Sequence, residues 1–187
     1  MIIKDIKKDS VVSMLEKIIW KKNYETEEHA KRMKRLSLKL GKKAGLSETS
    51  LKKLVLLAVL HDLGKIVIPD RILLKPDSLN REEWYKIKQH TIYGYNIALS
   101  YPETREIAEG ILYHHEWWDG SGYPEGLKGK EIPLISRIIS IVDAYDVMTH
   151  DRSYKEPLSK ARAREELKDY AGIQFDPALV PIFLNLI

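Results

Sequence analysis

The chain has 187 residues, 44% of them hydrophobic and 31% charged, which fits one globular domain with a sizeable core. It contains no cysteine, so disulfides and thiolate metal sites are excluded, and a reducing, cytoplasmic location is expected. No apolar run approaches the ~18 residues of a membrane span, and the net charge of +4 is spread over solvated helix faces, so we expect neither a membrane segment nor a DNA or RNA partner.

The first two predicted elements are helices. Residues 1–22 have apolar side chains at helical spacing and are interpreted as an N-terminal helix that could link to an upstream domain, which leaves 23–187 as the main domain. A second helix is predicted from about Tyr24 to Leu40. Glu25 and His29 stand one turn apart on it and could share a metal ion, the alternative being a surface Glu-His pair.

The third predicted helix is apolar nearly all round and is therefore expected to be central. Ser47 is a good N-cap, and the helix ends at the sequence HDLGK, which contains His61, Asp62 and Lys65. An ionised aspartate is rarely buried without a cation or strong hydrogen bonds. We interpret His61 and Asp62 as metal ligands, and the alternative is an Asp62 paired only with Lys65.

A loop over 69–76 precedes a helix that Asn80 is expected to cap, with Glu83 completing a capping box. That helix leads to His90, and a further helix is expected from Thr91 to Ser100. A lone histidine in this position is usually a satisfied polar residue. His90 is interpreted as a metal ligand only because other candidate ligands accompany it in the sequence.

The next predicted helix opens at Pro102 and ends in His114 and His115. These two histidines can hold one ion against the helix end, although an incidental pair in a solvated loop is the alternative. A loop follows that includes Gly120 and Gly122, and its glycines allow a ligand to approach the main chain closely.

Pro133 opens a strongly apolar helix that contains Asp143, followed by Asp146 at i+3. A metal ligand explains a carboxylate in an apolar run more simply than a buried polar network does. Two more helices are predicted, one from Ser159 to about Ala171 and, after Asp176 as N-cap and Pro177 at N1, an apolar helix from Leu179 to Ile187. No strand-like alternation is present, so the expected fold is all-α.

The candidate ligands form one set of nitrogen and oxygen donors. They are Glu25, His29, His61, Asp62, His90, His114, His115 and Asp143. Such a set exceeds the needs of one ion and fits two or three divalent transition-metal ions bridged by carboxylate. Without sulfur, it suits iron or manganese better than structural zinc. His150 is the one histidine outside the set, and we expect it at the surface.

Several motifs together resemble the HD-GYP family of the HD-domain phosphohydrolase superfamily. They follow one another over about residues 25–180 as HDLGK, IPD, IL, His90 with Gly94, HHEWWDGSGYPEGLKG, Asp143, DRSYK and QFDP. The resemblance implies a helical bundle of five core helices plus additional helices. It also implies hydrolysis of the bacterial second messenger cyclic di-GMP to pGpG, and in some members onward to GMP.

The resemblance also implies roles for individual residues. Seven of the candidates match the family's metal ligands, with Asp62 as the bridging carboxylate, and Glu25 matches a glutamate of the subset with a third metal. A trinuclear site is therefore expected, with iron as the leading metal. The positions that match substrate contacts are Lys65, Gly122, Tyr123, Pro124, Arg152 and Lys155.

The catalytic groups are expected to be Asp62, Lys65 and Asp146, with Asp146 orienting water or a leaving-group proton. The chain departs from the family pattern at Val67, Asp77-Ser78, His150 and Ser153, which concerns loop shape more than chemistry. Two alternatives stay open: a phosphohydrolase for another cyclic dinucleotide or nucleotide, and a non-catalytic binding or interaction module. An upstream sensory domain, a diguanylate cyclase partner and a homodimer are compatible with the sequence.

Overall fold

Helices make up the regular structure of this chain in the computed structural model, which describes residues 10–22, 26–150 and 156–187. Between the described residues, the only β-pairing is one isolated bridge that joins Ala171 to Phe175. The α-helices are α1 Val11–Lys21, α2 Glu27–Lys43, α3 Glu48–Leu60, α4 Asp70–Leu73, α5 Arg81–Lys88, α6 His90–Leu99, α7 Ala108–Leu112, α8 Leu134–Thr149, α9 Lys160–Asp169 and α10 Leu179–Leu184. Three 3₁₀ turns accompany them, η1 Leu63–Val67, η2 Arg105–Ile107 and η3 Gly129–Glu131. The all-α prediction is confirmed.

Helix starts follow the polar residues that the sequence indicated. The side chain of Ser47 accepts a hydrogen bond from the Ser50 amide at 3.2 Å, and Ser159 caps α9 in the same way. Asn80 and Glu83 form a reciprocal capping box at the start of α5. Each of these caps satisfies backbone N–H groups that the first helical turn would otherwise leave without a partner.

Two boundaries differ from the sequence-based expectation. The helix expected to open at Pro102 begins at Ala108, after η2, because Thr104 donates a hydrogen bond to the carbonyl oxygen of Ala98 at 2.8 Å and holds a turn. The last helix begins at Leu179 as expected but ends at Leu184 rather than Ile187, and the Asp176 carboxylate accepts from the Ala178 amide in an Asx-type turn instead of capping the helix. The expected loop over 69–76 also contains one helical turn, α4.

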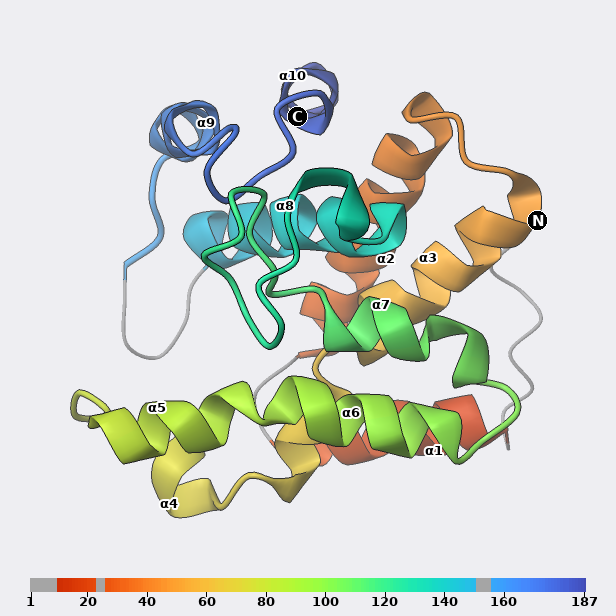
Figure 1. Ribbon diagram of the computed structural model, residues 1–187, viewed down its shortest axis with the longest axis vertical. Coiled ribbons are helices and arrows are strands. Elements are labelled where there is room, and N and C mark those ends of the chain that lie inside the picture. Colours follow the sequence, from red (N-terminus) through yellow and green to blue (C-terminus); the bar gives the residue numbers. More distant parts are fainter. Residues whose placement is uncertain (1–9, 23–25, 151–155) are drawn as a thin grey trace.

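The core is built around α3, which packs against α2 and α8. Leu54, Leu57 and Leu60 on α3 are fully buried, as expected for a helix that is apolar nearly all round. Figure 1 shows α8 lying across α2 and α3, with α9 and α10 at one end of the molecule and α4 and α5 at the other. Of the helices described, none is both long and apolar enough to cross a membrane.

One close backbone crossing fixes how the end of α3 meets α6. A Cβ built on Gly64 would lie 1.8 Å from the carbonyl oxygen of His90 and 2.5 Å from the amide nitrogen of Gly94. Only glycine fits such an approach of two backbones. The crossing brings the residues just before Gly64, His61 and Asp62, beside the first residue of α6, which is His90.

Candidate metal centre

The first group of candidate ligands joins three parts of the chain. One ligand atom from each of Asp62, His90, His114 and His115 lies within 4.8 Å of the others. The Asp62 Oδ1 atom is 3.1 Å from His90 Nε2 and 3.8 Å from His114 Nε2. The two imidazole Nε2 atoms are themselves only 3.4 Å apart, as expected for nitrogens that face a single cation.

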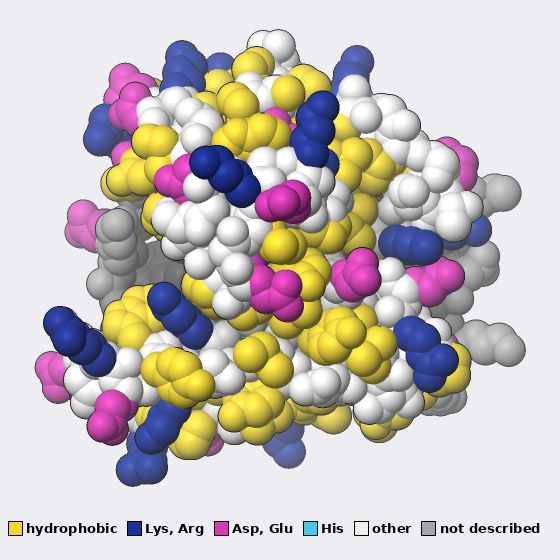
Figure 2. Space-filling view, in the orientation of Figure 1, with side chains coloured by type: hydrophobic (Ala, Val, Ile, Leu, Met, Phe, Trp, Pro, Cys, Tyr) yellow, Lys and Arg dark blue, Asp and Glu magenta, His cyan; other side chains and the backbone are white. Residues whose placement is uncertain are grey.

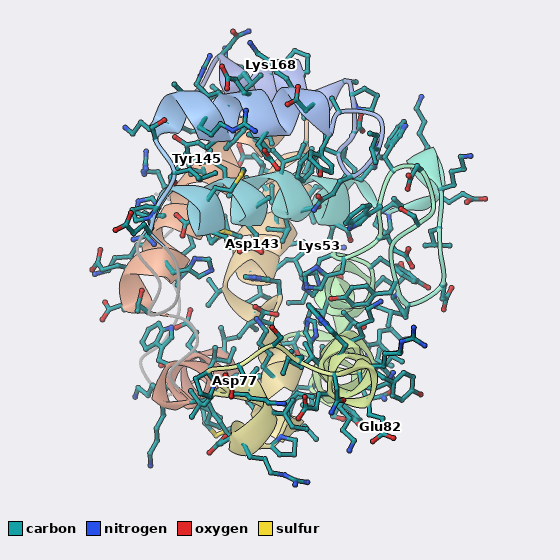
Figure 3. All side chains as sticks on the ribbon, turned by 90° about the vertical axis from the view of Figure 1, so that its left-hand side faces the viewer. Lys53, Asp77, Glu82, Asp143, Tyr145 and Lys168 are labelled. Atoms are coloured by element: carbon teal, nitrogen blue, oxygen red, sulfur yellow. The ribbon has the colours of Figure 1, made fainter. Side chains whose placement is uncertain are left out.

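The second group consists of His29 from α2, His61 at the end of α3 and Asp143 from α8. The Nε2 atoms of both histidines lie 3.9 Å from Asp143 Oδ1. Figure 3 shows Asp143 projecting from α8 on the side that faces α3. This group is also partly enclosed, because the Asp143 side chain is 21% exposed while the His61 side chain is 1% exposed.

Asp62 faces both groups. Its Oδ1 atom points to His90 and His114, whereas its Oδ2 atom lies 3.6 Å from His61 Nε2 in the second group. A carboxylate whose two oxygens face two sets of ligands has the arrangement that bridges a pair of ions. Lys65, three residues later, forms an ion pair with Asp62 Oδ2, so the Asp62–Lys65 pairing exists together with the ligand arrangement.

Hydrogen bonds orient three of the histidine rings with Nε2 toward the ligand groups. His90 Nδ1 lies 2.7 Å from the Ile87 carbonyl oxygen, and His114 Nδ1 lies 2.6 Å from that of Ile111. His29 Nδ1 lies 2.7 Å from Asp146 Oδ2. Because each acceptor needs a proton on Nδ1, the lone pair of each ring is left on Nε2 for a ligand.

Protonation states fit metal binding. Burial lowers the pKa of His61 to about 4 and lowers those of His90 and His115 as well, so these rings are neutral at pH 7. Burial alone would raise the pKa of Asp62, but Lys65 and His61 outweigh it and hold the pKa well below its usual range. The buried Nε2 atom of His29 has no hydrogen-bond partner among the described residues, as expected of an atom that binds an ion. The donor set therefore fits divalent transition-metal ions.

The candidate histidine ligands are hidden from the face of the molecule that Figure 2 shows. His29, His61, His90 and His114 are each at most 5% exposed.

Three of the candidate residues lie outside the described part of the chain. They are Glu25, Arg152 and Lys155, so the expected third-metal ligand and the two expected phosphate-binding cations stay predictions.

Asp146 lies behind the ligands rather than among them. It is 2% exposed and contacts Nδ1 of His29, on the side of the ring that faces away from the ligand group. Burial would raise its pKa, but hydrogen bonds from Arg32 and His29 lower the pKa to about 2. Sequence reasoning missed Arg32, whose position three residues after His29 on α2 was the available signal. His150, expected at the surface, has a side chain that is 41% exposed and whose Nδ1 atom lies 3.2 Å from Asp146 Oδ1.

The glycine loop lies beside the first ligand group. The Tyr123 ring stacks on His115, with centroids 5.0 Å apart and planes 27° apart. Burial raises the pKa of Tyr123, so its hydroxyl stays protonated at neutral pH. Lys88 at the end of α5, a second residue that sequence reasoning missed, places its ammonium nitrogen 5.0 Å from the centre of the same ring.

Two contacts hold this loop in place. Glu116 is 2% exposed, and its Oε1 atom accepts hydrogen bonds from the amides of Glu125 and Gly126 at 2.7 and 3.0 Å. On the other side, the Trp118 and Asp119 amides donate to the carbonyl oxygens of Gln174 and Ile173, at 3.1 and 2.9 Å. The first residue of the QFDP motif, Gln174, is therefore one of the residues that support the loop.

The chain is similar to known proteins over most of its length. Residues 13–179 match a family described as HD domain. The chain is 40% identical over 178 residues to a cyclic di-GMP phosphodiesterase of Thermotoga maritima, covering 94% of this chain and 48% of that protein. It is 39% identical over 163 residues to 3′3′-cGAMP-specific phosphodiesterase 2 of Vibrio cholerae, covering 86% of this chain and 31% of that protein.

Among solved structures, a cyclic GMP-AMP specific phosphodiesterase of Vibrio cholerae has a similar fold. The TM-score is 0.73 at 23% sequence identity, over 94% of this chain and 47% of that one. At this identity the likeness concerns the fold alone. The chain spans less than half the length of each of these three proteins.

Proposed function

Because this chain belongs to the HD domain family, we propose that it is a metal-dependent phosphodiesterase that hydrolyses cyclic di-GMP to pGpG. The observation that carries the proposal is the position of Asp62, whose two carboxylate oxygens face two separate groups of ligand atoms. The name of the Thermotoga maritima relative supports the choice of substrate.

The ligand groups fit two divalent transition-metal ions, and Glu25 is a candidate for a third. The absence of sulfur ligands favours iron, with manganese as the alternative. Ions bound there would supply Lewis acidity toward the phosphoryl oxygens and lower the pKa of the attacking water. Metal analysis of anaerobically purified protein, together with anomalous scattering, tests both the number of ions and the element.

The protein's own residues have separable tasks. Asp62 stays ionised and His61, His90 and His115 stay neutral at pH 7, so these residues can hold cations without first losing protons. Lys65, beside Asp62, supplies a positive charge where a non-bridging phosphate oxygen would gain negative charge. The Tyr123 ring stacks on His115 and lies under the Lys88 ammonium, and we expect it to contact a guanine base where the flexible Lys88 side chain moves aside. Arg152 and Lys155 are expected to hold phosphate oxygens.

The test is hydrolysis of cyclic di-GMP by purified protein supplied with Fe²⁺ or Mn²⁺, with products separated by chromatography. Replacing both His61 and Asp62 by alanine should abolish turnover and metal content together. Replacing the exposed Glu165 on α9 by alanine is the control and should change neither. Hydrolysis that persists in the double variant would refute the proposal.

A second candidate substrate is 3′3′-cGAMP, which is favoured by the 39% identity to the Vibrio cholerae phosphodiesterase that is specific for it. Parallel kcat/KM measurements with cyclic di-GMP and 3′3′-cGAMP decide between the two. A non-catalytic role would be indicated by less than one equivalent of transition metal in carefully prepared protein. A second-messenger substrate implies a cytoplasmic location, and an upstream sensory domain, a cyclase partner and a homodimer stay predictions.

A further inference from the structure

A cluster of ionisable side chains around the buried Asp146 lies behind one of the two ligand groups. At its centre, Asp146 Oδ2 lies 2.7 Å from Nδ1 of His29. Arg32 donates to the same carboxylate twice, from Nε to Oδ1 at 2.6 Å and from Nη2 to Oδ2 at 2.9 Å. The fourth member, His150, places its Nδ1 atom 3.2 Å from Oδ1. The Asp146 carboxylate, which lies on α8, is thus held by two residues of α2 and by the residue that follows α8.

This arrangement sets His29 apart from the histidines of the other group. His90 and His114 are oriented by neutral carbonyl oxygens that belong to Ile87 and Ile111. His29 alone among these three is oriented by a carboxylate. A carboxylate that accepts the Nδ1 proton makes the imidazole a more basic ligand than a carbonyl does, and loss of such a partner typically weakens metal binding about 10- to 100-fold.

Arg32 makes this carboxylate a fixed partner rather than a mobile one. Its two hydrogen bonds form a bidentate pair that fixes the plane of the carboxylate. A lysine at the same position would keep the charge but lose the planar fork. Arg32 therefore acts on the ligand group through Asp146, and Asp146 acts through His29.

We propose that Asp146, fixed by Arg32, is a positioning residue that gives the His29–His61–Asp143 group a higher metal affinity than the Asp62–His90–His114–His115 group. The two halves of the centre are then filled in order rather than together. This inference rests on the metal dependence in the proposed function. It assigns to Asp146 a role through His29 instead of direct contact with water or the leaving group.

The test is a titration of metal-free protein with Mn²⁺, followed by calorimetry and by electron paramagnetic resonance, neither of which depends on turnover. The wild-type protein should show a tight and a weaker class of site. Asp146→Asn should weaken the tight class about 10- to 100-fold and leave the weaker class unchanged. Arg32→Lys should cause a smaller loss at the same class, and it also serves as the test if Asp146→Asn does not fold.

A double-mutant cycle shows whether the effect passes through His29. In a His29→Ala background, adding Asp146→Asn should produce no further loss of Mn²⁺ affinity. Asp176→Asn is the matched control, because Asp176 is 4% exposed and is paired with Arg137 at 2.5 Å, yet contacts no candidate ligand. It should leave both classes of site unchanged, whatever it does to stability.

The outcomes separate the two proposals. If the wild-type protein binds no transition metal, the proposed function fails, and this inference fails with it. If the wild-type protein binds two ions but Asp146→Asn binds them with unchanged affinity, only the inference is overturned. Equal weakening of both classes, or a further loss in the His29→Ala background, would also overturn it, since both indicate a general structural effect.

Discussion

The metal-free protein should lose stability when the pH falls from 7.5 to 5.0, and His61 should account for a defined part of the loss. Its ring is completely buried, which lowers its pKa from 6.5 to about 4. In this pH range His61 therefore binds more protons in the unfolded chain than in the folded one, and its protonation favours unfolding. The stabilising contribution of neutral His61 is fully present above pH 6.5, decreases as the pH falls from 6.5, and is lost near pH 4.

The size of the effect follows from the two pKa values. At pH 5.0 the unfolded imidazole is almost fully protonated while the folded one is mostly neutral, and the difference corresponds to about 2 kcal/mol relative to pH 7.5. Burial also lowers the pKa values of His90 and His115, so the total loss should be larger than the share of His61.

Urea unfolding followed by circular dichroism, in the presence of a chelator, measures this loss. His61→Gln keeps a polar side chain but removes the titration, so its loss between the two pH values should be about 2 kcal/mol smaller than that of the wild type. Ser47→Ala is the control, because it removes an exposed helix cap but no titrating group, so it should keep the wild-type loss. An equal pH dependence in His61→Gln and wild type would refute the reasoning.

Three further predictions concern the backbone crossing, the loop and a helix cap. Gly64→Ala should lower the free energy of unfolding by roughly 3 kcal/mol and reduce metal content, because its Cβ would lie 1.8 Å from the His90 carbonyl oxygen. Gly45→Ala is the control and should cost only about 1 kcal/mol, because Gly45 has open space around it and a φ of +79°. Equal losses of unfolding free energy in urea would contradict this prediction. Glu116→Ala should raise KM for cyclic di-GMP about tenfold without changing metal content, because it removes the acceptor of two loop amides, and a loss of metal instead would show that the loop explanation is wrong. Asn80→Ala should cost about 1 kcal/mol with unchanged kcat/KM, because the cap is exposed, and loss of activity would disagree with its purely structural role.

Sequence reasoning anticipated those features of the fold that local chemistry decides. Ser47, Asn80 and Ser159 start helices because their side chains satisfy amides of the first turn. The helix start predicted at Pro102 was wrong, because the hydrogen bond from Thr104 back to Ala98 holds a turn there, and such a bond leaves no periodic pattern in the sequence. Tertiary hydrogen bonds of this kind are not visible in a sequence.

The candidate site likewise contains residues that the sequence could identify and residues that it could not. The histidines and Asp62 could be named because their residue types are unusual at the ends of apolar helices. The role of Asp146 could not be settled from the sequence, since its i+3 distance from Asp143 did not show that it lies behind His29. Arg32 looked like any other basic residue on a charged helix. Arg32 contacts Asp146 only because α2 and α8 pack together, which the sequence does not show.

The loop that carries Tyr123 depends on residues that are made late in synthesis. Its Trp118 and Asp119 amides donate to the carbonyl oxygens of Gln174 and Ile173, which come after every described candidate metal ligand in the chain. A growing chain on the ribosome therefore has its complete described ligand set before it has the segment that fixes this loop. Prematurely terminated products that end before Ile173 would contain every described candidate ligand but would lack both this support for the loop and the buried core residues of α10.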